Sequence, residues 1–518
     1  MRNRAFLPFF CILLLLFFAS SVYGATYYVK NSGNDSNSGL SDAEAWKTIS
    51  KVNSFSFSAG DTVCLKRGDV FDDAIFRNAK VDNFTIRDYG DGSKPHLNGD
   101  INKPIQIEDT PINNLVIQNI DIGGQDWYQS KNSNISITDV NGVIIDGVIG
   151  DGHFGGNKSD GKTAISISYC TGDIIVKNCN LYNWGPSAIP SAGTDFMGIA
   201  LLYIKSGKYQ IYNNTVHNVN ADCLHLYENT APGYVRDNIL YNAGEDGIDV
   251  KGTSNCEIFA NEFYRTESFV GKGGSGGYKT HIITHEGASP KSQQIIIRNN
   301  KFHDGNAAAI VTGNAENISI YENSVNNCLG AVIIANNSTN IEIHHNIIVN
   351  PQSGDGWEDM DSGCIYENNS SAGTKIYNNT IYNDSGACKH PISIACCNST
   401  QIYDNIVYTE GTDSNIFPLY TVACGTKPIV HSNCWYIRDN SNRTKFRGIL
   451  FSEPMLSEWR ADHPNAIFSD PLFTNAVAND FSLAANSPCR LTDRIIGAIQ
   501  TSGSSPLAAP SNFKTKSP

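Results

Sequence analysis

The segment YNNTV at residues 212–216 shows the pattern that decides the fold, an asparagine followed by any residue and then an apolar residue. The pattern recurs seven more times, and the asparagines of the eight copies are Asn214, Asn238, Asn261, Asn300, Asn323, Asn346, Asn379 and Asn405. Their spacings are 24, 23, 39, 23, 23, 33 and 26 residues. More degenerate copies lie earlier, around Asn119, Asp146 and Cys179. Such regular recurrence indicates a repeat architecture.

Short runs rich in Ile and Val lie between the repeated asparagines, for example Gln294–Arg298 and Ile341–His345. Their alternation of apolar and polar residues predicts β-strands. Units of this length with strands this short suit the coils of a solenoid, so we predict an all-β, right-handed parallel β-helix. Each asparagine is then expected to stack on the next at a turn and to hydrogen-bond along the column. A leucine-rich repeat is the alternative, but the leucine positions that it needs are missing.

Both ends of the predicted solenoid carry recognisable segments. Ala25–Asn31 is predicted to be a strand, and Ser41–Glu44 has the pattern of a capping box that opens a short helix through Val52. We expect this helix to cover the first coil, because an open end would expose unpaired strand edges. The tail from Thr501 is rich in Ser, Pro and Ala and is predicted to be disordered. One domain, with a cap at each end, is expected over residues 25–500.

The first 24 residues are predicted to be a secretory signal peptide. Arg2 and Arg4 precede the apolar run Ala5–Ala19, and small residues follow up to Gly24. The apolar run is short for a membrane span, so no membrane association is expected. We therefore expect an exported protein, extracellular or periplasmic, that is cleaved after Gly24.

Composition limits the partners. The 518 residues carry a formal net charge of −13, which argues against nucleic acid as a ligand. The same charge would repel an acidic glycan unless local cations bind it. The 14 cysteines include no metal-type Cys-x-x-Cys pair. We expect several of them to stack inside the fold as small apolar residues rather than to form a disulfide framework. We also expect a monomer.

Two coils bring acidic residues into register. Asp222 and Asp246 each lie 8 residues after the repeated asparagine of their coil, and His225 and Asp249 each lie 11 residues after it. Neighbouring coils are about 4.8 Å apart, so Asp222 and Asp246 are expected to be neighbours, with Glu245 beside them and Asp249 facing outward. Four converging carboxylates favour a divalent cation with oxygen ligands, and Ca²⁺ is the usual one outside cells. The alternative is a solvated acidic strip without function.

The following coil contains a long insertion, with the glycine-rich segment Gly271–Gly277 before an alternating run. Aligning Tyr278 with Ile248 places Lys279 over Asp249, facing outward. A bound cation would lower the pKa of this lysine from about 10.4, so that a neutral amine could remove a proton. Lys272 is a competing candidate, but its glycine neighbours offer no rigid strand.

Further outward residues were assigned to substrate binding. They lie two residues beyond His225, Asp249 and Lys279, and they are Tyr227, Lys251 and His281. Arg265 and His285 are weaker candidates for the same role.

These motifs resemble the family 9 polysaccharide lyases, which are β-helix pectate lyases. Asp222 matches the first acid of that family, Glu245 and Asp246 the acidic pair, and Asp249 the last acid, while Gly277-Tyr278-Lys279 matches the lysine motif. Two departures are a Glu where the family has Asp, and a lysine that comes a few residues early. The closing segment SDPLFTNAVANDFSLAANSPCR, at residues 469–490, also resembles that of many secreted β-helix proteins.

The resemblance implies a Ca²⁺-dependent lyase that acts on an acidic, uronate-containing polysaccharide, with pectate as the first candidate. Ca²⁺ held by the four acids would bind the uronate carboxylate, and Lys279 would take the C5 proton. Two other classes stay open. A β-helix glycoside hydrolase could use Asp246 and Asp249 as its carboxylate pair, and a non-catalytic adhesin would only bind the glycan.

Overall fold

A computed structural model describes residues 24–498. Its gaps are residues 74–75, 99–103, 109–110, 124–133, 153–161, 186–195, 267–279, 286–289, 306, 329–332, 352–362, 369–370, 385–387, 389, 396–397, 411–418, 423–426 and 439–462. The signal peptide prediction and the predicted disordered tail both lie outside the described residues.

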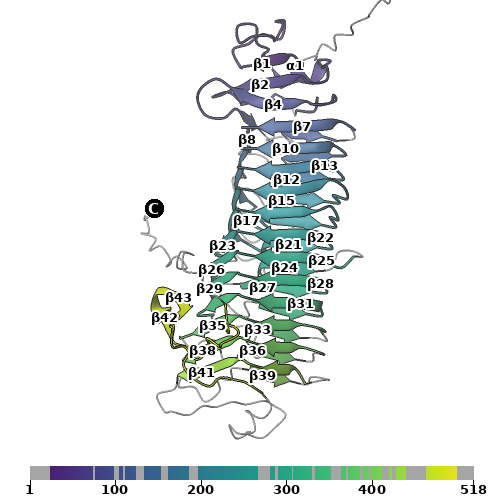
Figure 1. Cartoon of the computed structure of the whole chain (residues 1–518). Helices are drawn as coiled ribbons and strands as arrows, with labels where there is room; N and C mark the ends of the chain where they lie inside the picture. Colours follow the sequence, from purple (N-terminus) through teal and green to yellow (C-terminus); the bar gives the residue numbers. More distant parts are fainter. Residues whose placement is uncertain are drawn as a thin grey trace, which may run out of the picture.

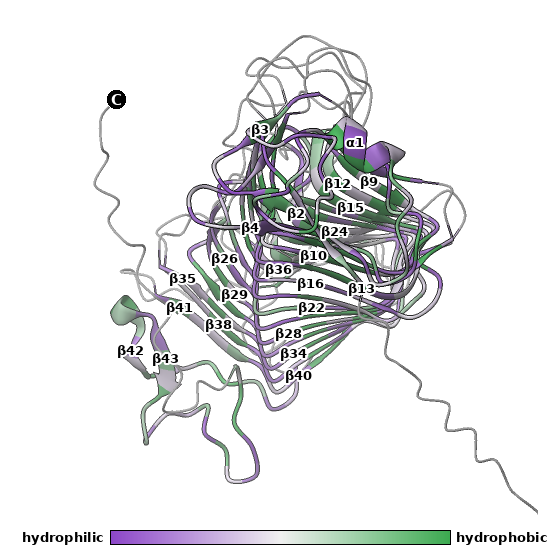
Figure 2. Ribbon diagram, turned by 90° about the horizontal axis from the view of Figure 1, so that it is seen from above, coloured by the Kyte–Doolittle hydropathy of each residue, from purple (hydrophilic) through white to green (hydrophobic). Residues whose placement is uncertain are grey.

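Three long sheets, each built only of parallel strands, form the sides of a column (Figure 1). The first sheet runs from β1 (Thr26–Val29) to β40 (Ile429–His431), and the second from β3 (Val70–Phe71) to β41 (Cys434–Arg438). The third runs from β6 (Ile105–Ile107) to β39 (Leu419–Val422). Seen from above, the three sheets surround one interior (Figure 2). The predicted right-handed parallel β-helix is confirmed.

One coil takes one strand from each sheet. The coil that begins with β16 (Lys208–Tyr212) continues through β17 (Thr215–Val219) to β18 (Leu224–Tyr227). Inward side chains of consecutive coils stack on one another, as Leu224 on Ile248 does in the third sheet, and both are fully buried. The core is therefore a set of apolar columns, which explains why the strands read as short alternating runs.

The repeated asparagines form one buried column at the turn between the first and second sheets. Each side-chain amide donates to the Oδ1 atom of the asparagine one coil further on, at 2.9–3.1 Å. Each Oδ1 atom also accepts from the backbone N–H of the preceding asparagine, as at Asn214 and Asn238 (3.0 Å). The column ends one coil later than predicted, at Asn433.

The structure shows which of the earlier, degenerate copies extend the asparagine column. Cys179 occupies the position before Asn214, and its backbone N–H donates to the Asn214 Oδ1 atom (2.9 Å). Asp146 is wrong as a column member, because its pairing with Lys177, which in turn pairs with Tyr212, places it two positions early. By the same register Asn119 lies one position early. The buried apolar residues Ile120 and Val148 take the column positions there.

The N-terminal helix α1 (Ile49–Ser54) is shorter and later than predicted. Its N-cap is Thr48, whose hydroxyl accepts from the Lys51 N–H (3.0 Å). Ser41 and Glu44 do interact, but they close only a turn (3.2 Å). The reason is that Trp46 first pairs with the strand residue Val29, so the chain is extended there. Ile49 and Val52 of α1 join the apolar core, next to the first coils.

The C-terminal segment folds back on the second sheet. β42 (Phe473–Asn475) and β43 (Asp480–Leu483) pair antiparallel and lie beside β35 (Thr380–Asn383) and β38 (Ile406–Glu410) (Figure 1). Phe481 packs on the ring of Tyr382, with 5.2 Å between their centroids. The predicted C-terminal cap thus covers the outside of the column.

The cysteines largely serve as buried packing groups. Eight of the described cysteines are buried thiols, which confirms that prediction, while Cys364 and Cys388 form a disulfide. No helix within the described residues is long and apolar enough to cross a membrane.

Candidate functional site

The candidate site lies on the outer side of the third sheet, where β18 meets β21 (Asp246–Lys251). The two strands pair so that Leu224 faces Ile248 and His225 faces Asp249, which is the predicted coil register. Ile248 and Val250 point into the core and are fully buried. Asp249 alternates with them and points to the outer side, as predicted.

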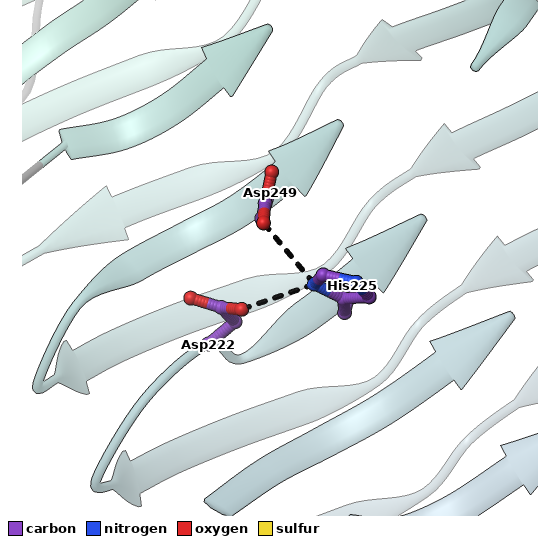
Figure 3. Close-up of side chains that lie close together, drawn as sticks. All are labelled: Asp222, His225 and Asp249. Carbon is purple, nitrogen blue, oxygen red and sulfur yellow. Dashed lines mark hydrogen bonds and ion pairs between the residues drawn. The ribbon is translucent and has the colours of Figure 1, made fainter. Parts of the chain in front are cut away.

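A single imidazole bridges two carboxylates in this site. The Nδ1 atom of His225 lies 3.2 Å from an Asp222 oxygen and 3.2 Å from an Asp249 oxygen (Figure 3). The other oxygen of Asp249 lies 2.8 Å from the Nε2 atom of His285. Asp222 and Asp249 are only 3% and 7% exposed. The cluster is therefore a largely desolvated group of charges rather than a solvated acidic strip.

Asp246 joins the same group from the beginning of its strand. Its backbone N–H donates to the second oxygen of Asp222 (3.2 Å), which confirms that these two acids are neighbours. One oxygen of Asp246 accepts from both the backbone N–H and the hydroxyl of Thr280, at 2.9 Å each. Glu245, the residue before it, is half-buried. The predicted acids are thus on adjacent coils, with Asp222 in direct contact with Asp246.

Burial and mutual repulsion raise the pKa of two of the acids, whereas two histidines lower the pKa of the third. Burial and the charges of Asp249 and Glu245 raise the pKa of Asp222 to about 7, against the hydrogen bond from His225. Burial and the neighbouring acids also raise the pKa of Asp246 well above its usual value. Burial opposes ionisation of Asp249 as well, but hydrogen bonds and charge from His225 and His285 outweigh it and lower its pKa.

His225 responds in the complementary direction. Burial alone would lower its pKa, but the two carboxylates outweigh burial and raise the pKa to about 10. At neutral pH the ring is therefore an imidazolium, and it occupies the space between Asp222 and Asp249. This positive charge offsets the repulsion that a metal ion was expected to relieve.

The donor set also suits a divalent cation. One oxygen from Asp222, one from Asp249 and one ring nitrogen of His225 lie within 4.8 Å of one another. Two carboxylates with an imidazole fit transition metals, whereas Ca²⁺ prefers oxygen ligands and would use the carboxylates of Asp222, Glu245, Asp246 and Asp249. In either case the cation competes with the proton on His225, so binding is expected to release a proton.

The predicted base was aligned wrongly. Lys279 and its competitor Lys272 lie outside the described residues. The strand that follows, β24 (Thr280–His285), pairs Ile282 with Ile248 and Ile283 with Asp249, so Ile283 holds the position that had been assigned to the lysine. The error is four residues, because the insertion is longer than the alignment on Tyr278 assumed.

His281 is also wrong as a sugar contact. It is fully buried, and its ring packs beside the stacked rings of Phe263 and Phe302, with centroids 6.0 and 5.8 Å away. Its Nδ1 atom is 2.6 Å from the hydroxyl oxygen of Thr266. Burial lowers its pKa to about 3, so the ring is neutral and belongs to the core.

Three of the predicted substrate residues form a row. Tyr227 pairs with Lys251, and Lys251 pairs with His285, so the three lie at the same position of consecutive coils and are half-buried. Arg265 is exposed at the turn after β23 (Glu262–Tyr264), before the third sheet rather than after it, and is not part of this row.

The two histidines of the cluster carried a usable signal. The coil register of the sequence aligns His225 with Asp249, although the resemblance gives it no role. His285 pairs with Lys251 one coil further on, but the insertion before it hides this register in the sequence. A histidine in register with an aspartate one coil away is sufficient to suggest a charge pair in such a fold.

No protein-family model and no curated protein sequence matches this chain. Among solved structures, a lacto-N-biosidase from Eubacterium ramulus is 14% identical over 79% of this chain and 67% of its own, with a TM-score of 0.39. An alginate lyase from Paenibacillus sp. str. FPU-7 is 17% identical over 55% and 97%, with a TM-score of 0.42. A mannuronan C-5 epimerase A-module from Azotobacter vinelandii is 11% identical over 79% and 91%, with a TM-score of 0.42. Similarity at this level assigns no activity to this chain.

Proposed function

We propose that this protein is an exported polysaccharide lyase that cleaves a uronate-containing polysaccharide by β-elimination at the cluster of Asp222, Asp246 and Asp249. The observation that carries the proposal is the buried bridge of two carboxylates by one imidazole on adjacent coils, beside a row of half-buried polar side chains. Three buried acids weaken the fold unless they are neutralised, so a cluster of them favours a functional role.

The charges of the site fit an acidic sugar. A protein with a net charge of −13 needs a local positive charge to hold a uronate carboxylate. Before a cation binds, His225 provides an imidazolium, and Lys251 lies in the adjacent coil. Ca²⁺ bound by the acids would neutralise the uronate carboxylate and thereby acidify the C5 proton. Lys251, Tyr227 and His285 would hold the sugar on the outer side of the third sheet.

The bond changes follow from the chemistry of a 4-linked uronate. A neutral amine takes the C5 proton, the electrons of the C–H bond form the C4–C5 double bond, and the C4–O bond breaks with its electrons on the leaving oxygen. That oxygen then takes up a proton. We keep Lys279 as the proposed base on the order of the motif alone, since its place relative to the acids lies outside the described residues.

Absorbance of unsaturated uronides tests the proposal directly. Purified protein is incubated with polygalacturonate or alginate, with Ca²⁺ or with a chelator, and ultraviolet absorbance is followed together with reducing ends. We expect both signals to rise with Ca²⁺ and neither to rise with the chelator. Asp249→Asn and Lys279→Ala should lose the activity, whereas Asp173→Asn, an exposed acid paired with Lys208 on the first sheet, should keep it.

Two outcomes would reject the lyase. Reducing ends without ultraviolet absorbance would show hydrolysis, and then a carboxylate pair of the cluster would be the acid and the nucleophile or base. Binding of the polymer without any product, unaffected by Lys279→Ala, would show a glycan-binding protein.

A further inference from the structure

The turn that follows the third-sheet strands has a left-handed backbone in coil after coil. In each coil one residue of this turn has a positive φ, between 49° and 60°. The described residues at this position are Asp139, Tyr169, Tyr203, Glu228, Gly252, Asn314 and Asn337. Gly, Asn and Asp adopt this conformation most readily, whereas a bulky side chain is disfavoured. Tyr169 and Tyr203 therefore stand where the fold favours asparagine, in two successive coils.

These two tyrosines are not held there by the core. Tyr169 is 55% exposed, and neither ring belongs to a buried apolar cluster of the described residues. Their rings stack on each other, with 4.7 Å between centroids and 9° between planes. Tyr203 meets the ring of Tyr227 edge-on at 5.3 Å. Strained residues that contribute nothing to the core are candidates for binding a ligand.

The aromatic surface is continuous with the candidate site. Tyr227 lies in the same strand as His225, and their rings are nearly parallel with centroids 6.0 Å apart. In the other direction the Nζ atom of Lys205 lies 5.5 Å from the centroid of the Tyr203 ring. Five consecutive coils, from His285 to Tyr169, thus present polar and aromatic side chains along one edge, over about 19 Å at ~4.8 Å per coil.

We propose that Tyr169, Tyr203 and Tyr227 form a sugar-binding strip. It holds the part of the polysaccharide that extends from the cluster over the preceding coils of the protein. The proposal rests on the proposed function, because it assumes a uronate polymer at the cluster. The open face of Tyr169 packs against the C–H face of a pyranose ring, and the phenol hydroxyls bond to sugar hydroxyls. Lys205 pairs with a uronate carboxylate.

The strip has a length-dependent consequence. An oligosaccharide that fills only the cluster does not reach Tyr169, two coils beyond Tyr227. A polymer reaches both. The strip therefore contributes to the binding of long substrates and leaves the chemical step unchanged, which separates it from residues of the cluster.

The test exploits the backbone of the turn. The double variant Tyr169→Asn, Tyr203→Asn puts asparagine, which adopts the left-handed conformation readily, at both turns. The variant should therefore fold and keep or raise its melting temperature. We expect the KM for polygalacturonate or alginate to rise about tenfold with kcat unchanged, and the KM for a disaccharide or trisaccharide to stay the same. Tyr234→Thr, an exposed strand position on the first sheet, is the matched control and should change neither.

Direct binding separates this inference from the lyase proposal. Calorimetry measures the affinity for the same polymers of the Asp249→Asn protein, with and without the two tyrosine substitutions. Loss of affinity in the tyrosine variant supports the strip even if no cleavage is ever seen. Equal affinity and equal KM in the presence and absence of the tyrosines overturn it, and so does a failure of the wild-type protein to bind either polymer.

Discussion

The substitution His225→Gln removes the charge that neutralises the buried acids and leaves an amide donor in its place. In the folded protein the pKa of His225 is raised from 6.5 to about 10. At pH 7, three units below that value, the raised pKa of His225 stabilises the folded protein by about 4 kcal/mol, at about 1.36 kcal/mol per unit. Breaking a buried ion pair from one side typically costs about 3 to 5 kcal/mol, which agrees in size. We therefore expect the free energy of unfolding to fall by roughly 4 kcal/mol at pH 7.

The pH dependence of this loss has a definite sign. Because the folded-state pKa lies above the unfolded value, the stabilisation by His225 is fully present below about pH 6.5 and is lost as the pH rises through about 10. Urea unfolding of the wild type and the variant between pH 6 and 10 measures it. The difference between the two proteins should shrink steadily over that range.

His303 provides a matched control on the second sheet. It also lies between two acids, 3.2 Å from both Glu262 and Asp304, but its side chain is 31% exposed, against 11% for His225. Exposed pairs contribute about 0–1 kcal/mol, so His303→Gln should cost less than 1 kcal/mol. An equal loss in both variants, or a loss at His225 that does not change with pH, would refute the charge argument.

Further predictions concern the cation, the asparagine column and export. Ca²⁺ should raise the melting temperature of His225→Gln more than that of the wild type, in a thermal unfolding assay, because the variant leaves two carboxylates without a counter-charge. Asn300→Ala should lower the free energy of unfolding by about 3 kcal/mol in urea, since Asn300 accepts twice from Asn261 (3.0 Å each) and donates to Asn323 (3.1 Å), and buried partners would be left unpaired. Mass spectrometry of the protein recovered from an exporting host should give Ala25 as its first residue, and an intact N-terminus would reject the signal peptide.

The fold was predictable because its information is local and repeated. From Asn214 onward, each coil has an asparagine whose amide bonds to the next coil, and the pattern identified Asn214 and seven later positions. The first coils instead rely on apolar contacts at Ile120 and Val148, which look like any other core residue. The repeat could not be followed there with single-residue accuracy.

The site was predictable only where the coils have nearly equal length. Asp222 and Asp246 are separated by 24 residues, which is one coil, and the structure brings them into contact. Between Asp249 and the next coil lies an insertion, and its length does not say how many residues belong to the loop. The lysine was therefore misplaced by four residues, and His281 was assigned to the surface although its strand turns it inward.

Two departures from the preferences of the repeat lie side by side, and this is the strongest reason to regard the region as one functional surface. The outer position held by His225 and Asp249 is occupied in the other described coils by uncharged residues, among them Gln106, Ser136, Ser166, Ala200, Ile283, Val311, Tyr366 and Ser393. Only two adjacent coils of this series carry charges there. The neighbouring left-handed turn departs from Gly, Asn and Asp at Tyr169, Tyr203 and Glu228, in consecutive coils that lead to the same place. Buried carboxylates and bulky residues in a left-handed turn both work against stability, and folding alone gives no reason for both to occur in neighbouring coils.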